Sequence, residues 1–243
     1  IARNPRNPNG FLDFLLFLTS LEPGPPGCGN LENLRIPYPI LFYPTAQQHL
    51  NSYSAVAKRL HQEDEKIIEA TTFFNGENVS LAGEIRSLMD VQMRIPEEFR
   101  AAIKEPDLVW LRRETSEASS NILLRRVPYT DETQLTREGL KNIRNEIGKE
   151  YISSTLPGTY MRINDVDLPL IVETTRVNGD YALEARGIWD IVNDFMGGAF
   201  VSYLVYDPGK AELLFMDAFV HAPGKDKRDL MQQMDYILKT AQY

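Results

Sequence analysis

The dipeptide Asn178-Gly179 sets the direction of two strands, because it separates the apolar runs Leu170–Val177 and Tyr181–Trp189. A two-residue type I′ hairpin turn needs positive φ at both central residues, and asparagine followed by glycine meets this need well. We therefore expect the two runs to be antiparallel neighbours in one sheet. Parallel neighbours would need a much longer crossover connection.

Two further turn signals predict two more hairpins. Asp207-Pro-Gly-Lys210 combines a proline, which presets φ at the second turn position, with Gly209, which we expect to supply the left-handed residue. The polar segment Thr115–Ser120 interrupts another pair of β-like runs. The paired runs are Phe200–Tyr206 with Glu212–Val220, and Leu108–Glu114 with Asn121–Val127.

Apolar residues at helical spacing predict three helices around these strands. Ser80 is the expected N-cap of the first, residues 131–134 signal the start of the second, and Pro223-Gly224 opens the last. The expected apolar faces are Leu81, Ile85, Leu88 and Met89, then Leu140, Ile143, Ile147 and Tyr151, then Leu230, Met234, Ile237, Leu238 and Ala241. The order β-β-α-β-β-β-β-β-α predicts an α+β fold, a mostly antiparallel sheet with helices packed on one face.

The chain is expected to divide near Asp90. Residues 91–243 form the antiparallel α+β domain, and residues 1–90 form a poorly defined N-terminal region with one or two helices. Prolines and glycines between residues 22 and 44 oppose regular structure there. Helical spacing begins after Thr45 and is carried by Leu50, Tyr53, Ala57 and Leu60, with Ile67 and Ile68 as a continuation before a break at residues 73–76.

Charge and motif content exclude several classes of protein. A formal net charge of −8 opposes nucleic-acid binding, which needs a basic surface. The single cysteine, Cys28, excludes an intrachain disulfide and a thiolate metal cage. His49, His61 and His221 form no metal-binding motif, and no phosphate loop, dinucleotide fingerprint or nucleophile elbow occurs. We expect no cofactor, no bound metal and no nucleic-acid partner.

Four arginines stand on the two strands of the predicted 108–127 hairpin. Side chains alternate across a strand, so one arginine from each pair can share a face and clamp a carboxylate or phosphate between two guanidinium groups. The alternative is that they pair with nearby acids or cover the sheet edge with their aliphatic stems, which is the more frequent role of arginine. The four are Arg112, Arg113, Arg125 and Arg126.

The segment Gly187–Phe200 carries a second candidate site. Asp190 and Asp194 have the chemistry of an acid–base pair or of ligands for a hard cation, and Gly197-Gly198 permits a close backbone approach. The alternative is structural: a glycine bulge bends the chain into the next strand, and the aromatic residues of the segment enter the core. Those residues are Trp189, Phe195 and Phe200.

Asp217 and His221 share one face of a predicted strand. Positions four apart lie about 13 Å apart in an extended chain, so the two side chains cannot hydrogen-bond directly. We interpret His221 as a loop histidine before the last helix rather than as a catalytic base, because no nucleophile is identifiable nearby.

Nine blocks of residues carry a resemblance to a known family, and the most specific is Asn193-Asp-Phe-Met-Gly-Gly198. The blocks are Ile95-Pro96, Val109–Thr115, Asn121-Ile122, Pro128-Tyr129, Gly158–Met161, Arg186–Trp189, Asn193–Ser202, Phe219–Pro223 and Lys227-Arg228. With them, the chain from Met93 to Tyr243 resembles the exported lipoproteins of Bacteroidetes grouped as domain-of-unknown-function family 4837. That pattern has proline where Ala199 stands and tyrosine where His221 stands, so the resemblance gives neither residue a special role.

The resemblance implies a precursor with a lipoprotein signal peptide and a protein tethered to the cell envelope; a cytoplasmic location is the alternative. Cys28 does not resemble a lipidated cysteine, because the preceding Gly24-Pro-Pro-Gly27 is not a lipobox. We expect the anchor to have been lost upstream, so that the membrane is contacted only through it. The family implies no particular reaction.

Three hypotheses about function follow. The first is a non-catalytic envelope lipoprotein that binds a protein partner or a small anionic ligand. Its expected ligand-binding residues are Arg113, Arg126, Arg186, Trp189, Asp194, Gly197 and Gly198. The second is a hydrolase-like enzyme that uses the carboxylates of Asp190 and Asp194. The third is a structural or assembly component of the envelope.

Overall fold

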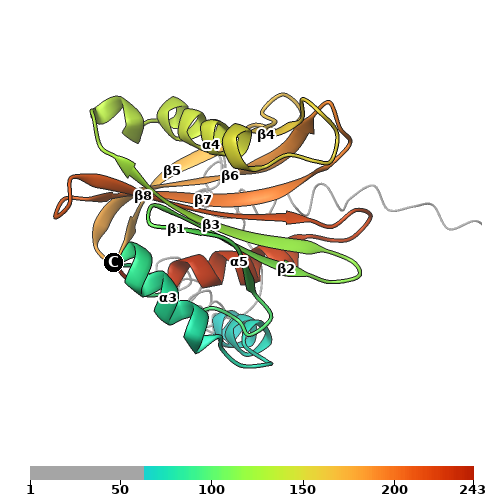
Figure 1. Cartoon of the computed structure of the whole chain (residues 1–243), viewed down its shortest axis with the longest axis horizontal. Helices are drawn as coiled ribbons and strands as arrows, with labels where there is room; N and C mark the ends of the chain where they lie inside the picture. The colour runs from blue at the N-terminus through green and yellow to red at the C-terminus, as the bar shows by residue number, and fades with distance from the viewer. Residues whose placement is uncertain (1–62) are drawn as a thin grey trace, which may run out of the picture. The chain divides into compact units, whose positions relative to one another are not determined.

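A computed structural model describes residues 63–243 of the chain (Figure 1). The chain divides into two units, and the second, Ile68–Tyr243, contains every strand in the part described. After a helical segment over residues 63–72, the elements are α3 (Val79–Met89), β1 (Arg100–Glu105), β2 (Leu108–Glu114), β3 (Ser119–Pro128), the 3₁₀ helix η2 (Glu132–Leu135), α4 (Arg137–Tyr151), β4 (Tyr160–Ile163), β5 (Ile171–Val177), β6 (Asp180–Val192), β7 (Gly197–Asp207), β8 (Glu212–His221) and α5 (Arg228–Lys239).

The strands form one eight-stranded sheet in the order β1-β2-β3-β8-β7-β6-β4, and β5 pairs with the first half of β6. Every pairing is antiparallel, which confirms the expected α+β class and the expected sheet. The pairing of β3 with β8 places the β2–β3 hairpin beside the β7–β8 hairpin. Strand β1 was not expected, because its sequence Arg-Ala-Ala-Ile-Lys-Glu has little period-two alternation.

The turns follow the sequence prediction with one exception. Asn178 has φ of 53° and Gly179 has φ of 94°, which confirms the hairpin between β5 and β6. In the turn between β7 and β8 the left-handed residue is Ala211, with φ of 51°, and not Gly209 as expected. The Gly209 amide donates to the Asp207 carboxylate at 3.0 Å. Because the Asp207 side chain closes the first half of the turn, the residue with positive φ comes later, at Ala211, just before β8.

Helices cover both faces of the sheet rather than the one face expected. Figure 1 shows α4 over one face, with α3 and α5 over the other. The central strands explain this arrangement, because eight consecutive residues of β8, Leu213–Val220, are buried. A strand that is apolar on both faces needs a covering layer on each of them.

The helix starts differ in detail from the expected ones. The N-cap of α3 is Asn78, whose side chain accepts from the Leu81 amide at 3.1 Å, and not Ser80. The start signal at residues 131–134 is a capping box on η2, whereas α4 begins at the N-cap Thr136. The buried helix residues match the expected apolar faces except that Leu88 is exposed, Tyr151 and Leu230 are half-buried, and Met231 is buried beside Leu230.

Several expectations lie outside the described residues, including the helix carrying Leu50 to Leu60 and any role for Cys28, His49 or His61. Within them, the helix over residues 63–72 and the break at residues 73–76 are confirmed, and Gly76 has φ of 95°. The helix α3 belongs to the same unit as the sheet, although it precedes the expected boundary at Asp90. Among residues 63–243, no helix has the length and apolar character needed to cross a membrane.

Candidate functional site

A pocket of about 310 Å³ opens at one end of the sheet, on the face that α4 covers. It lies where β2, β6 and β8 end, where β3 and β7 begin, and beside Ile152 at the end of α4. Half of the residues that line it are apolar or aromatic and half are polar or charged, so it offers both apolar contact and hydrogen-bonding groups to a small molecule. Six of the residues that line it carry most of the argument below: Trp110, Asn121, Met161, Trp189, Phe219 and His221.

The aromatic rings of the pocket pack against one another and are held in fixed orientations. The ring of Phe219 lies 5.7 Å from that of Trp189 at 81°, an edge-to-face contact, and 6.4 Å from that of Trp110. The Trp110 indole N–H donates to Asn121 Oδ1 at 3.1 Å, and the Asn121 amide donates in turn to Ser119 Oγ. The half-buried Trp110 is therefore a rigid apolar surface beside the opening.

Trp189 owes its place to Gly198, its cross-strand neighbour on β7. A Cβ on Gly198 would lie 3.1 Å from Trp189 Nε1 and 1.8 Å from the backbone oxygen of Val220, so no side chain fits there. Trp189 is only 3% exposed, and its Nε1 has no hydrogen-bond partner among the described residues. A buried donor of this kind costs about 1–3 kcal/mol unless something accepts from it.

His221 also lines the pocket. Its Nδ1 lies 2.9 Å from the backbone oxygen of Gly197, and a carbonyl oxygen only accepts, so Nδ1 carries the proton. In the neutral imidazole the other nitrogen, Nε2, is then an acceptor. The His221 ring lies 6.2 Å from that of Trp189. Trp189 and His221 are therefore neighbours, and both line the pocket.

The charges at the rim of the pocket are already paired. Arg112 contacts Glu114 on the same face of β2, and Lys225 Nζ lies 2.7 Å from a carboxylate oxygen of Glu117. These pairs are exposed and contribute little to stability. Among residues 63–243, each Arg or Glu side chain that lines the pocket therefore has an ion-pair partner.

Behind the pocket lies a buried charged cluster that the sequence reading missed. Arg144 on α4 donates from Nε to Asp217 at 3.1 Å, and Ser202 Oγ donates to the same carboxylate oxygen at 2.6 Å. The Arg144 guanidinium lies 3.7 Å from the centre of the Phe200 ring and contacts the sulfur of Met161, which lines the pocket. An arginine four residues after Leu140, on the apolar face of a helix, was the signal available in the sequence.

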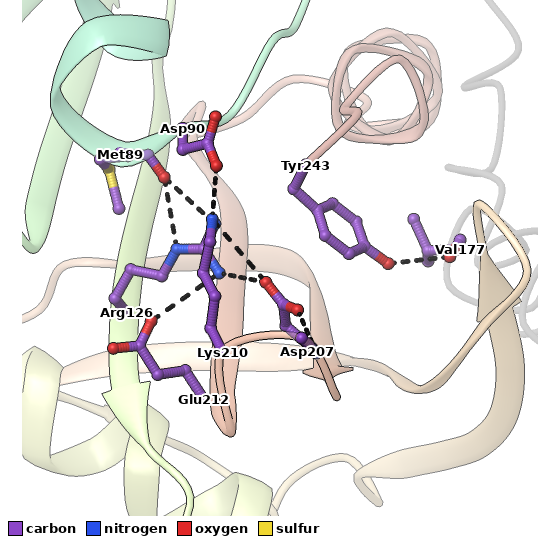
Figure 2. Close-up of polar contacts among 9 residues, drawn as sticks. Met89, Asp90, Arg126, Val177, Asp207, Lys210, Glu212 and Tyr243 are labelled. Atoms are coloured by element: carbon purple, nitrogen blue, oxygen red, sulfur yellow. Dashed lines mark hydrogen bonds and ion pairs between the residues drawn. The ribbon is translucent and has the colours of Figure 1, made fainter.

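The three arginines predicted to bind a ligand lie on the other face of the sheet, away from Trp189. Arg126 joins α3 to the turn between β7 and β8 (Figure 2). Its Nε and Nη2 donate to the backbone oxygen of Met89 at 3.3 and 3.1 Å, and Nη1 donates to Asp207 at 3.0 Å. Lys210 pairs with Asp90 alongside at 2.6 Å. This contact caps the end of α3 and holds no open position for a ligand.

Arg113 and Arg186 are also engaged by neighbouring residues. Arg113 Nη2 donates to Ser120 Oγ at 3.4 Å, its guanidinium lies over the Phe99 ring, and burial lowers its pKa. Arg186 contacts Glu184 and lies 3.0 Å from Asp235.

The Arg186 contacts belong to a larger buried network between β6, β7 and α5. Asp235 also accepts from Lys239 at 2.8 Å and from the Tyr203 hydroxyl at 2.6 Å. Burial raises the pKa of Asp235, but Arg186 and Lys239 outweigh it and hold that pKa below its usual value. Burial, together with the charges of Asp235 and Glu184, raises the pKa of Tyr203.

The two carboxylates of the enzyme hypothesis are held by separate partners. Asp190 accepts from Arg162 at 2.8 Å and from Asn164 at 3.0 Å. Hydrogen bonds from the Ser154 hydroxyl and the Phe195 amide lower the pKa of Asp194. Neither aspartate lines the pocket. In the part of the chain that the structure describes, no cluster of three or more His, Cys, Asp or Glu side chains could hold a metal ion.

The glycine pair is not a bulge, because the pairing of β6 with β7 continues without a register shift from Ala182 to Asp190. Trp189 and Phe200 are in the core as the structural alternative predicted, whereas Phe195 is fully exposed at the tip between β6 and β7. Of the seven expected ligand-binding residues, only Trp189 lines the pocket, while Gly197 and Gly198 contact the lining residues His221 and Trp189. Trp110, Asn121 and Phe219 were missed, because strands distant in sequence bring them together.

Comparisons with known proteins give one family. The family model described as Domain of unknown function (DUF4837) matches residues 78–240. A search of curated proteins finds no match. The solved structures that resemble the chain include the Ran-binding protein Mog1p of Saccharomyces cerevisiae, at 7% identity and a TM-score of 0.39, and a point mutant of Mog1, at 8% and 0.38. Each match covers 63% of this chain and 89% of the solved chain. Likenesses this weak carry no argument about function.

Proposed function

This chain belongs to the domain-of-unknown-function family DUF4837, and from that premise we propose that it is a non-catalytic binding protein that holds a small ligand in its aromatic pocket. The observation that carries the proposal is the Trp189 indole N–H, which is buried at the pocket and has no partner among the described residues. A buried donor without an acceptor is costly, and a ligand oxygen removes that cost.

The rigidity of the pocket supports binding over a purely structural role. Trp110 is fixed by Asn121, Trp189 is seated over Gly198, and His221 is tied to the backbone of Gly197. Side chains held in this way lose little conformational freedom when a ligand arrives, so more of the contact energy appears as affinity. The volume of about 310 Å³ is at the lower end for ligand sites and fits a small molecule.

Intrinsic fluorescence tests this proposal directly, because the chain has two tryptophans and both line the pocket. We expect a panel of monosaccharides, nucleosides, amino acids and small carboxylic acids to contain members that change the tryptophan emission in a saturable way. The same members should raise the melting temperature, since a ligand that binds only the folded state stabilises it. A panel without any saturable response in either measurement contradicts the proposal.

A matched pair of variants locates the response. Ser153 lines the pocket and is exposed, so Ser153→Tyr should obstruct the opening and weaken binding at least about tenfold, by loss of contact area. Thr155→Tyr adds the same side chain two residues away, outside the lining, and should leave the affinity unchanged. Equal affinities in both variants would show that the ligand binds elsewhere.

We further propose that the protein acts at the cell envelope as a lipoprotein of Bacteroidetes, on the strength of the family resemblance described above. In cells that produce the natural precursor, the protein should partition into the detergent phase and incorporate labelled fatty acid. Recovery of the unlabelled protein from the cytosolic fraction contradicts this location and leaves the binding proposal unaffected.

A further inference from the structure

We infer that the ligand of the pocket is a neutral saccharide of about one ring, held by a hydroxyl group between Trp189 and His221. This inference rests on the proposed binding function and adds the chemical class of the ligand. It departs from the small anionic ligand expected from the arginines, because those arginines lie on the other face of the sheet.

The first step is the charge around the pocket. Arg112 is paired with Glu114, and Glu117 is paired with Lys225, which lies outside the lining, so each Arg or Glu side chain that lines the pocket has an ion-pair partner. A carboxylate or phosphate ligand would have to break one of these pairs to find a cation. It would also meet two rim carboxylates, and like charges repel at short range. A neutral ligand leaves both pairs intact.

The second step is the pair of hydrogen-bonding groups at the floor. Trp189 Nε1 only donates, and Nε2 of His221 accepts when the imidazole is neutral, because Nδ1 is committed to the Gly197 oxygen. The centres of the two rings are 6.2 Å apart. A hydroxyl is the simplest group that accepts from one ring and donates to the other. A carboxylate oxygen accepts only and would face the lone pair of His221 Nε2.

The third step is the apolar wall beside these groups. Trp110 is half-buried and fixed by Asn121, and Met196 and Ile152 continue the apolar lining of the pocket. A sugar ring has one face of C–H groups that packs on an indole and an edge of hydroxyls that needs partners. A volume of about 310 Å³ corresponds to roughly ten water molecules, at about 30 Å³ each, which leaves room for one sugar ring.

The test compares ligands on the unmodified protein, so it does not depend on the folding of a variant. Tryptophan emission is titrated with the methyl glycosides of glucose, galactose and mannose, with glucuronate as the matched anion and with indole as a flat apolar ligand without a hydroxyl. We expect at least one neutral glycoside to bind with a Kd of about 1 mM, as a small ligand of low efficiency should. Glucuronate should bind at least about tenfold more weakly than its neutral counterpart.

The outcomes separate this inference from the proposed function. Glucuronate that binds as tightly as the neutral glycosides, or a response to indole alone, overturns the saccharide inference and leaves a working pocket. A response to no member of this set, while another class in the wider panel does bind, also overturns it. If no compound in either experiment gives a saturable response, the binding proposal itself is contradicted.

Two variants then test the hydroxyl contact. Trp189→Phe keeps an aromatic ring but removes the N–H, and should weaken glycoside binding about tenfold. Tyr243→Phe removes a donor that hydrogen-bonds the Val177 backbone oxygen at 2.8 Å outside the pocket lining, and serves as the control with a change in glycoside affinity of less than about threefold. Unfolding curves confirm that each variant is folded. Equal losses in the two variants contradict a specific role for the Trp189 N–H.

Discussion

Trp189 on β6 and Gly198 on β7 are directly opposed, and the indole Nε1 lies 3.1 Å from where a Cβ of Gly198 would stand. The same Cβ would lie 1.8 Å from the backbone oxygen of Val220. Because Gly198 has no side chain, the Val220 backbone on β8 can approach β7 closely and Trp189 can take its place at the pocket. One glycine links the sheet to the candidate site.

Gly198→Ala should lower the free energy of unfolding by at least about 2 kcal/mol, because backbone atoms must move to admit the methyl group. Urea denaturation measures this change, and tryptophan emission should shift as the indole is displaced. Gly83→Ala is the control: it lies inside α3 with nothing within 4 Å of its Cβ position. This substitution should stabilise the protein by up to about 1 kcal/mol. Similar effects of the two substitutions contradict the steric role of Gly198.

Arg126→Met should lower the free energy of unfolding by about 3–5 kcal/mol, because it leaves the Asp207 carboxylate and the Met89 oxygen without their buried donor. The exposed pair of Lys104 with Glu84 gives a matched control. Lys104→Met should change the stability by no more than about 0.5 kcal/mol. A loss below 1 kcal/mol for Arg126→Met would show that water replaces the arginine at the end of α3.

The hairpins β2–β3 and β5–β6 followed from local rules, since the polar segment 115–120 and Asn178-Gly179 each act on the strands that they join. The error at Gly209 has a local cause too, because proline and glycine were read without the Asp207 side chain that closes the turn. Strand β1 lacks alternation and is held by its pairing with β2, which no pattern within Arg100–Glu105 reveals.

The candidate site was only partly predictable, because its residues come from strands that meet through the pairing of β3 with β8. Trp189, Gly197 and Gly198 were found as neighbours in sequence. The partners of the arginines could not be found in this way, since Arg126 and Asp207 are 81 positions apart. An aromatic residue is also no guarantee of burial, as the exposed Phe195 at a hairpin tip shows.

Stability should fall in acid through Asp235. Burial raises the pKa of this carboxyl, but Arg186 and Lys239 lower it by more, so its pKa in the folded state is below that in the unfolded state. Its contribution to stability is therefore complete above the unfolded-state pKa of about 4 and is lost as the pH falls through the lower folded-state value. Urea denaturation between about pH 5 and pH 2 measures the slope, which Asp235→Asn should reduce. Asp226→Asn removes an exposed carboxylate near the start of α5 and should retain the slope of the unmodified protein.

The buried pair behind the pocket should behave as a unit. Arg144 and Asp217 are each 2% exposed, so Asp217→Leu leaves a buried guanidinium with no carboxylate and should cost about 3–5 kcal/mol. Arg144→Met leaves Asp217 with only the Ser202 hydroxyl and should cost a similar amount. The double variant removes both charges together, and apolar side chains of similar size should recover most of the loss, because a buried ion pair contributes little net stability once its desolvation is counted. Urea denaturation of the four proteins gives the coupling energy. If the double variant instead loses the sum of the two single losses in unfolding free energy, Arg144 and Asp217 each have their own partners. In that case the position of Met161 in the pocket wall does not depend on the contact between Arg144 and Asp217.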